Sequence, residues 1–213
     1  MAIVINGSGT VTGISVGGLP DGIVDAGTLA TDSVDSAELI DGAIDTAHIA
    51  ADQITSAILP AGSVLQVVQT VKSDTFTTTS TDWTNITGLT VNITPASTSN
   101  KVLVQVHLST GNSSDRTSAY RITGGTGLFS GDSDSAGRVE ATTATSSEST
   151  TCGQKAVSFC KLDSPSSTSE QTYAVQVNSQ TSNTTTINRS ECDTDAEYCY
   201  RTISTITVME IAG

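Results

Sequence analysis

The sequence predicts a mainly β protein, with a short N-terminal repeat stalk followed by an antiparallel C-terminal domain of β-sandwich or jelly-roll type. Three observations support this prediction. An apolar residue recurs at every fifth position from 14 to 64, short runs of alternating apolar and polar residues fill much of the rest, and Ser, Thr, Gly and Asp separate those runs. The expected boundaries are 1–20 for a leading segment, 21–62 for the stalk and 63–213 for the β domain.

The five-residue period excludes both common regular structures for the stalk. A helix turns by about 100° per residue, so a step of five scatters the apolar side chains around its surface. A flat strand would send successive ones to opposite faces, because five is an odd step. We therefore expect these residues to meet on an axis shared by three chains: Ile14, Leu19, Val24, Leu29, Val34, Leu39, Ile44, Ile49, Ile54 and Leu59.

A finer repeat of ten residues starts at Val24, Val34 and Ile44, with a degenerate fourth copy at Ile54. In the first three copies an Asp follows the apolar residue, as a helix N-cap does, so each unit is expected to join an extended pair to a short capped helical turn. A unit with two large apolar residues cannot be stable alone. A trimeric fibre resolves this, while a solenoid and an unstructured linker are the alternatives.

Seven runs in the C-terminal part have the period of two that predicts strands. In "KVLVQVHL", the side chains of Val102, Val104, Val106 and Leu108 share one face, as in a strand with one buried side. No helical stretch separates the runs, so an antiparallel sandwich is expected. The other six are "VLQVVQTV" from Val64, "ITGLTVNIT" from Ile86, "AYRIT" from Ala119, "KAVSFCKL" from Lys155, "TYAVQVN" from Thr172 and "RTISTITVMEI" from Arg201.

The last of these runs departs from simple alternation. Ile203, Met209 and Ile211 lie on one parity, whereas Ile206 and Val208 lie on the other. The pattern predicts either a bulge near Ser204 or burial on both faces, as in a strand at a subunit interface.

Charge excludes two classes of partner. The chain has 22 acidic and 9 basic residues, a net charge of -13, and no Lys/Arg cluster that could neutralise phosphates or anionic lipid. We expect no nucleic acid partner and no membrane insertion, since no apolar run approaches the ~18 residues of a spanning helix. The first residues, "MAIVINGSGTVTG", lack the basic start and apolar core of a secretion signal.

The four cysteines, Cys152, Cys160, Cys192 and Cys199, are confined to the C-terminal third and do not have zinc-site spacing. They allow up to two disulfides with three pairings if the protein reaches an oxidising exterior, and buried thiols otherwise. Without a secretion signal, release by cell lysis is the expected route to that exterior.

Four stretches follow one another in the chain: "INGSGTVTGISVGGLPDG", the "DGAIDTAHIA" repeat, "GSVLQVVQTVKSDTFTTTSTDWTNITGLTVNITPASTSNKVLVQV" and "INRSECDTDAEYCYRTISTITVMEIAG". Together and in this order, they resemble tail-fibre proteins of tailed phages, particularly those of marine cyanobacterial phages. The resemblance implies a virion protein assembled in the host cytoplasm. Residues 1–20 would dock to tail or baseplate proteins, a short trimeric shaft would follow, and a β-rich head would contact a host-surface glycan or protein. The alternative is a capsid-decoration or tail-collar/baseplate protein that binds other virion proteins.

Catalytic motifs are not found, so we expect no enzyme, no cofactor and no metal. His48 and His107 are interpreted as structural or solvated. The loops "GDSDSAG" from Gly131 and "ECDTDAE" from Glu191 alternate oxygen ligands as calcium loops do, but lack the closing Glu, and are interpreted as solvated turns. Paired acids could also serve a glycosidase, a minor alternative whose candidates are Asp132, Asp134, Glu140, Asp193 and Asp195.

Aromatic residues are the better candidates for recognition, because sugars and proteins are commonly bound on aromatic faces. Trp83 and Tyr173 lie beside apolar strand patterns and are predicted to pack in the core. Tyr198 and Tyr200 follow the acidic stretch "DTDAE" and are the candidate receptor contacts. The contact surface is expected to consist of the segments 110–118, 128–152 and 190–200.

Overall fold

The computed structural model describes residues 4–5, 11–12, 44, 48–49, 54–55, 58–113, 115–131, 137–146 and 152–213. The chain divides into two compact units, Met1–Ile54 and Thr55–Gly213. The described part of the first unit contains a short antiparallel ladder in which β1 (Val4–Ile5) pairs with β2 (Val11–Thr12). Most of the expected docking segment and stalk lies outside the described residues. No helix in the described part of the chain could span a bilayer.

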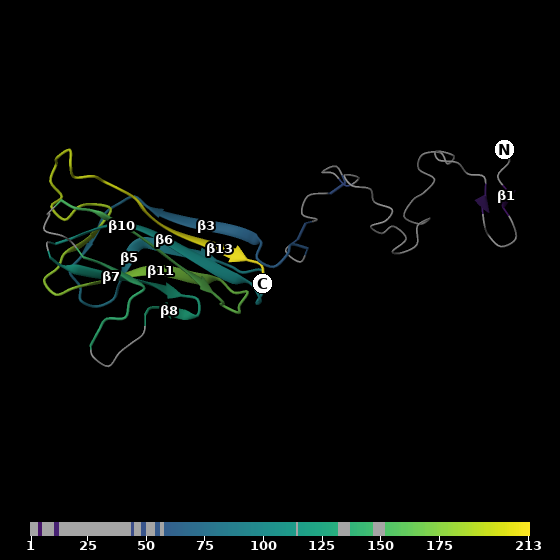
Figure 1. Ribbon diagram of the computed structural model, residues 1–213, viewed down its shortest axis with the longest axis horizontal. Coiled ribbons are helices and arrows are strands. Elements are labelled where there is room, and N and C mark those ends of the chain that lie inside the picture. The colour runs from purple at the N-terminus through teal and green to yellow at the C-terminus, as the bar shows by residue number, and fades with distance from the viewer. Residues whose placement is uncertain are drawn as a thin grey trace. The chain divides into compact units, whose positions relative to one another are not determined.

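The second unit is built from two antiparallel sheets that face each other across a common core (Figure 1). The larger sheet has the order β3-β13-β6, with β10 on the other side of β6. The short β12 pairs with the last residues of β6, and β4 pairs with β12. Its strands are β3 (Val64–Lys72), β4 (Phe76–Thr78), β6 (Lys101–Asn112), β10 (Lys155–Asp163), β12 (Thr185–Ile187) and β13 (Ser204–Ile211).

The smaller sheet has the order β5-β11-β7, and β7 also pairs with β8 and β9. Its strands are β5 (Thr84–Ile93), β7 (Thr117–Gly124), β8 (Gly127–Phe129), β9 (Thr143–Ser146) and β11 (Gln171–Ser179). Each of the seven predicted runs contributes a strand to one of the two sheets, so the mainly β antiparallel prediction is confirmed for this unit. The long strands β3, β5, β6, β7, β10 and β11 alternate between the two sheets in chain order.

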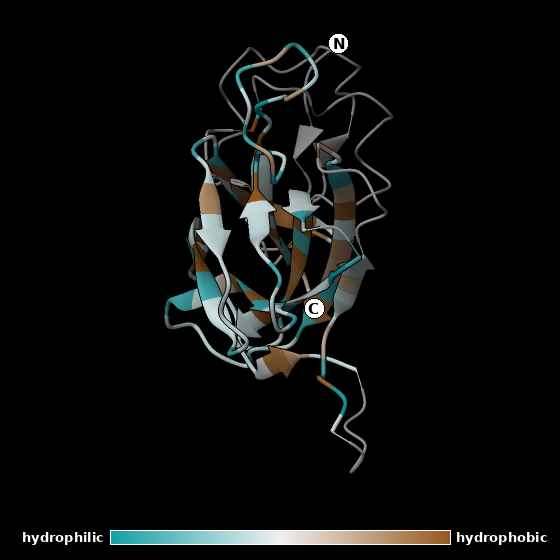
Figure 2. Cartoon of the chain, turned by 90° about the vertical axis from the view of Figure 1, so that its left-hand side faces the viewer, coloured by the Kyte–Doolittle hydropathy of each residue, from teal (hydrophilic) through white to brown (hydrophobic). Residues whose placement is uncertain are grey.

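The core forms because this alternation brings the apolar face of each strand to the space between the sheets. From β6, Val102, Val104, Val106 and Leu108 are at most 3% exposed, as their spacing predicted. Figure 2 shows bands of hydrophobic residues on the strands, with hydrophilic residues between these bands and on the connections. Burying each such side chain contributes about 1.5–3 kcal/mol, which is the main stabilisation of the sandwich.

The bulge expected near Ser204 is not found there. β13 begins at Ser204 and pairs regularly with β3 and β6, while Ile203 precedes the strand and is half-exposed. The register shift lies at the opposite end, between Glu210 and Ile211. Ile203 belongs to the preceding connection, so its parity does not report on the strand. Within β13, Ile206 and Val208 are buried on one side and Met209 and Ile211 are half-buried on the other, as the second alternative requires.

The two ends of the sandwich differ in what they carry. At the end called the base, Gly62 donates its N–H to the carbonyl of Ala212 (2.8 Å), so the chain enters the sandwich beside its C-terminal residues. The other end, called the loop end, gathers the connections 113–116, 180–184 and 188–203. Figure 1 shows the long connection before β13 at the end of the sandwich away from the C-terminus.

A buried carboxylate fixes the base. Glu210 is 1% exposed and accepts hydrogen bonds from Asn100 Nδ2 (2.5 Å), Gln66 Nε2 (2.5 Å) and the Ala96 N–H (2.6 Å). Burial pushes the pKa of Glu210 upward, but the three donors favour the charged form more strongly, so its pKa lies below the ordinary value. This carboxylate therefore ties β13 to β3 and to the connection between β5 and β6.

A second buried acid holds the turn between β7 and β8 at the base. Asp163 accepts from Tyr173 Oη (2.7 Å) and from the backbone and hydroxyl of Thr126. Gly125 lies between them at φ +57°, and an added Cβ would fall 1.9 Å from Asp163 Oδ2. Glycine is required here because a side chain would displace the buried carboxylate.

Candidate contact surface

A buried polar network supports the loop end from below. Ser118 donates to Asn112 Oδ1 (2.5 Å) and shares a hydrogen bond with the Thr185 hydroxyl (2.5 Å), which in turn contacts the Ser179 hydroxyl (2.8 Å). Asn183 donates to the Ser118 hydroxyl at 3.0 Å. These residues come from both sheets and are at most 5% exposed, so the strand ends that carry the loops are joined by satisfied hydrogen bonds rather than by apolar packing.

The connection 188–203 is the longest one described at the loop end, and its first residue anchors it. Asn188 adopts a left-handed conformation with φ 62° and is fully buried. Its side-chain amide donates to the carbonyls of Lys72 (2.8 Å) and Asp74 (2.9 Å), and its carbonyl oxygen Oδ1 accepts from Ser204 Oγ (2.6 Å). Asparagine suits this position because its side chain tolerates positive φ and can both donate and accept.

Two arginines converge on one acid within this connection. Asp193 accepts a hydrogen bond from Arg201 and lies 3.5 Å from Arg189 Nη1. The hydrogen bond from Arg201 is the main reason why the pKa of Asp193 lies below its ordinary value, and the charge of Arg189 adds to it. Of the glycosidase candidates, Asp193 is thus held in its charged form, whereas a general acid requires a raised pKa. Asp132 and Asp134 lie outside the described residues.

The two candidate tyrosines project from the folded connection. Tyr198 is 58% exposed and Tyr200 is 67% exposed. Their backbone is nevertheless held, because Gln154 Nε2 donates to the Tyr200 carbonyl (2.7 Å) and the Cys199 N–H donates to the Ala196 carbonyl (3.0 Å). Exposed aromatic rings on an ordered backbone lose little conformational entropy on binding, which is the arrangement that a recognition surface needs.

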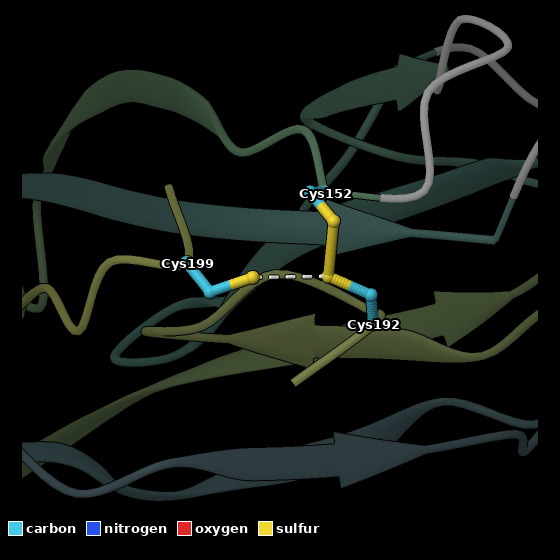
Figure 3. Close-up of side chains that lie close together, drawn as sticks. All are labelled: Cys152, Cys192 and Cys199. Carbon is cyan, nitrogen blue, oxygen red and sulfur yellow. Dashed lines mark hydrogen bonds between the residues drawn. A yellow bond between two sulfur atoms is a disulfide. The ribbon is translucent and has the colours of Figure 1, made fainter. Parts of the chain in front are cut away.

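Three of the four cysteines, Cys152, Cys192 and Cys199, lie close together (Figure 3). The structure pairs Cys152 with Cys192, which joins the segment before β10 to the 188–203 connection. Cys199 points its thiol at Cys192 with 3.2 Å between the sulfur atoms, whereas Cys160 is exposed on β10. All three clustered sulfur atoms lie within 4.8 Å of one another. If reduced, they offer a soft metal three ligands, one short of an ordinary structural zinc site.

The predicted contact segments are distributed unevenly around this surface. The segment 190–200 lies within the anchored connection, and 110–118 comprises the end of β6, the 113–116 connection and the start of β7. The segment 128–152 includes the end of β8 and all of β9, but residues 132–136 and 147–151 lie outside the described residues. Sequence reasoning missed the residues that hold the surface, namely Asn188, Arg189, Arg201 and Gln154, since their roles depend on partners distant in the chain.

The two aromatic residues expected in the core have different environments. Tyr173 is fully buried, as predicted. Trp83 is only half-buried and lies outside the core, because the guanidinium of Arg121 stacks over its ring at 4.1 Å from the ring centre. Arg121 also donates from Nε to Gln176 Oε1 (2.8 Å), so this pair belongs to the outer side of the smaller sheet. The prediction for Trp83 was therefore wrong.

Of the expected axis residues, only the last four are described. Ile44, Ile49 and Ile54 are 51%, 37% and 53% exposed in the single chain, and Leu59 is half-buried. The other six, Ile14, Leu19, Val24, Leu29, Val34 and Leu39, lie outside the described residues. His48 is exposed, and His107 shares a 3.0 Å hydrogen bond with the Ser158 hydroxyl on the outer side of the larger sheet.

A scan against protein-family models found no match for this chain, and a search of curated proteins found none either. A proposal for function consequently rests on the repeat, the fold and the geometry of the loop end.

Proposed function

We propose that the chain is a structural component of a phage virion, a homotrimeric tail fibre or spike whose C-terminal β domain adheres to the host cell surface. Residues 1–20 dock to other virion proteins, 21–62 form the stalk, and 63–213 form the head. The observation that carries the proposal is the position of the loop end, at the opposite end of the sandwich from the point where the chain enters it. A head mounted at its base presents the loop end to its surroundings.

The repeat supports the trimeric part of the proposal. Ile44, Ile49 and Ile54 are between 37% and 53% exposed in the single chain, which is costly for large apolar side chains in water. Meeting equivalent residues of sister chains on a common axis would bury them. A five-residue spacing suits this arrangement because it matches neither a lone helix nor a flat sheet.

Adhesion by such a protein is a matter of multivalency. A single loop end with two exposed tyrosines offers a small contact, and a site with a Kd of about 1 mM contributes only about 4 kcal/mol. A trimer carries three equal sites and a virion carries several trimers. Linked sites can raise the overall affinity by about 10²–10⁴ without any new contact, so weak recognition at each tip suffices.

The proposal is tested by competition for host cells. Purified full-length protein, added to cells before the phage that encodes it, is expected to reduce phage adsorption. The double variant Tyr198→Ala/Tyr200→Ala is expected to lose most of this effect. Thr168→Ala, at an exposed position in the connection between β10 and β11 at the base, lies outside the predicted contact segments and serves as the control; it should compete like the unaltered protein. Absence of cell binding at saturating protein concentration contradicts the adhesion proposal.

The alternative role, a capsid-decoration or tail-collar/baseplate protein, predicts a different outcome. Such a protein would bind purified virion particles or their components through its loop end and would leave host cells uncovered. Binding of the Tyr198→Ala/Tyr200→Ala variant to virion proteins then separates the two roles. Loss of virion binding supports decoration, and loss of cell binding alone supports adhesion.

A further inference from the structure

The larger sheet has an unusual outer side, defined here as the side facing away from the core and called the outer face. One cross-strand row on this face is apolar in all four long strands, β3, β13, β6 and β10. Met209 of β13 lies opposite both Val67 of β3 and Leu103 of β6, and Leu103 lies opposite Leu162 of β10. Val67 and Leu162 are 56% and 48% exposed. Single exposed apolar residues are ordinary, but a row that continues across four strands marks a binding surface.

The next row of the outer face is polar but carries no charge. It runs from Gln69 through Thr207 and Gln105 to Cys160, with a 2.8 Å hydrogen bond from Gln69 Nε2 to Thr207 Oγ1. These side chains line a shallow hollow in the middle of the face. The two rows therefore form a continuous surface without a carboxylate.

This lack of acidic groups bears on which partner fits. The chain has a net charge of -13, so copies of it repel one another over most of their surface. The loop end, for instance, carries Glu191, Asp193, Asp195 and Glu197. Glu210 of β13 points to the other side of the sheet and is buried. The outer face is thus a place where copies can approach without placing carboxylates opposite each other, and its charged residue, Lys101 opposite Ile211, lies at the edge.

The outer face also continues the apolar series of the stalk. The five-residue spacing passes from Leu59 to Val64, the first residue of β3, which is 52% exposed and lies opposite Ile211 of β13. If copies of the chain associate through these apolar residues, each chain would enter its β-sandwich at the edge of the outer face.

The size of the face explains why the stalk is needed. Four strands about 4.8 Å apart and about 24 Å long give a surface on the order of 500 Å². A standard interface buries about 800 Å² on each partner, so the face alone would form a weak contact. Tethering through the stalk raises the effective concentration of a second face enough to close it.

We infer that the outer face of the larger sheet turns toward the axis of the proposed trimer and packs against the same face of the other copies of the chain. The inference rests on the proposed function in one respect, the association of copies through the repeat. It assigns the apolar row of Val67, Met209, Leu103 and Leu162 to the interface, and it leaves the loop end free.

Cys160 provides a native probe, because it is exposed in the single chain and lies on the outer face, where β10 contributes it to the uncharged row. The full-length protein is treated with a maleimide under native conditions, and modification is measured at the Cys160 peptide by mass spectrometry. If the face is covered, Cys160 should react at least about tenfold more slowly than in the unfolded protein, since the contact must open first. Leu162→Glu places a carboxylate on the face and should restore rapid reaction. Leu128→Glu, equally exposed on the smaller sheet, should not.

Three outcomes overturn the inference: rapid modification of Cys160 in the unaltered protein, protection that Leu162→Glu does not relieve, and protection in a protein whose mass by light scattering is that of one chain. The last would mean that another segment of the same chain covers the face. A denaturation curve of Leu162→Glu controls for misfolding. If the unaltered protein does not bind host cells but its Cys160 is protected, the proposed adhesion is overturned and the proposed interface is retained.

Discussion

The base and the loop end of the sandwich are stabilised by different means. At the base, the buried carboxylates of Glu210 and Asp163 each accept several hydrogen bonds, and these bonds hold the connections. At the loop end, the long connection is held from outside by a disulfide and by the exposed ion pairs of Asp193, above the polar network around Ser118. The contrast indicates that the base is a rigid mount, whereas the loop end can change its surface residues at little cost to the fold.

The largest loss of stability is expected from a substitution at Gly125, in the base. Gly125→Ala adds a Cβ at positive φ and forces it against Asp163 Oδ2. Left-handed strain of about 1–2 kcal/mol, together with about 1–3 kcal/mol for each disturbed buried hydrogen bond, should lower the free energy of unfolding by about 2–5 kcal/mol. Chemical denaturation measures this. Gly137→Ala, at φ +79° with open space around it, is the matched control and should show the strain alone.

The disulfide is the corresponding test of the loop end. Cys152→Ser/Cys192→Ser removes the bond and should cost about 2–4 kcal/mol, because the unfolded chain regains the freedom of a large loop. Thermal unfolding with and without reductant measures the loss. Cys160→Ser, the exposed cysteine, should leave the unfolding curve unchanged. If the double variant unfolds like the unaltered protein, the loop end does not depend on this bond.

The buried carboxylate of the base gives a pH-dependent prediction. The pKa of Glu210 is lower in the folded than in the unfolded protein, so its contribution to stability is complete above the ordinary pKa of 4.5 and is lost as the pH falls through the folded value. Glu210→Gln should cost about 1–3 kcal/mol at neutral pH, since a side-chain amide would meet the donors of Asn100 and Ala96. Its unfolding free energy should also fall less on acidification below pH 4.5 than that of the unaltered protein. An unchanged acid dependence would mean that Glu210 is not the group responsible.

The smallest effect is expected at the exposed ion pairs. Arg201→Ala should raise the pKa of Asp193 toward its ordinary value, because the hydrogen bond from Arg201 is the main cause of its lowering. Stability should change little, as is usual for exposed ion pairs. Carboxyl titration by nuclear magnetic resonance measures the pKa. No shift on substitution would contradict the assigned partner.

The sequence was sufficient to predict the strands whose apolar residues alternate, such as β6, because alternation directly reports a buried face. The short strands β4 and β12 are mostly threonine, as at Thr77 and Thr186, and offered no such signal. The cysteine pairing and the partners of Asn188 could not be predicted either, since they depend on which loops the topology brings together. Exposure of Tyr198 and Tyr200 followed from their position in an acidic connection, whereas Trp83 was misplaced because its partner Arg121 lies on a strand distant in the chain.

The central claim, that the loop end is the free end of a virion fibre, is tested most directly by imaging the assembled particle. Electron cryomicroscopy of virions carrying a bulky label at Ala196, within the 188–203 connection, would locate this end. The account predicts that the label lies at the distal tip of a projecting fibre, clear of other virion proteins. A label found against the capsid or tail, covered by neighbouring proteins, would contradict it.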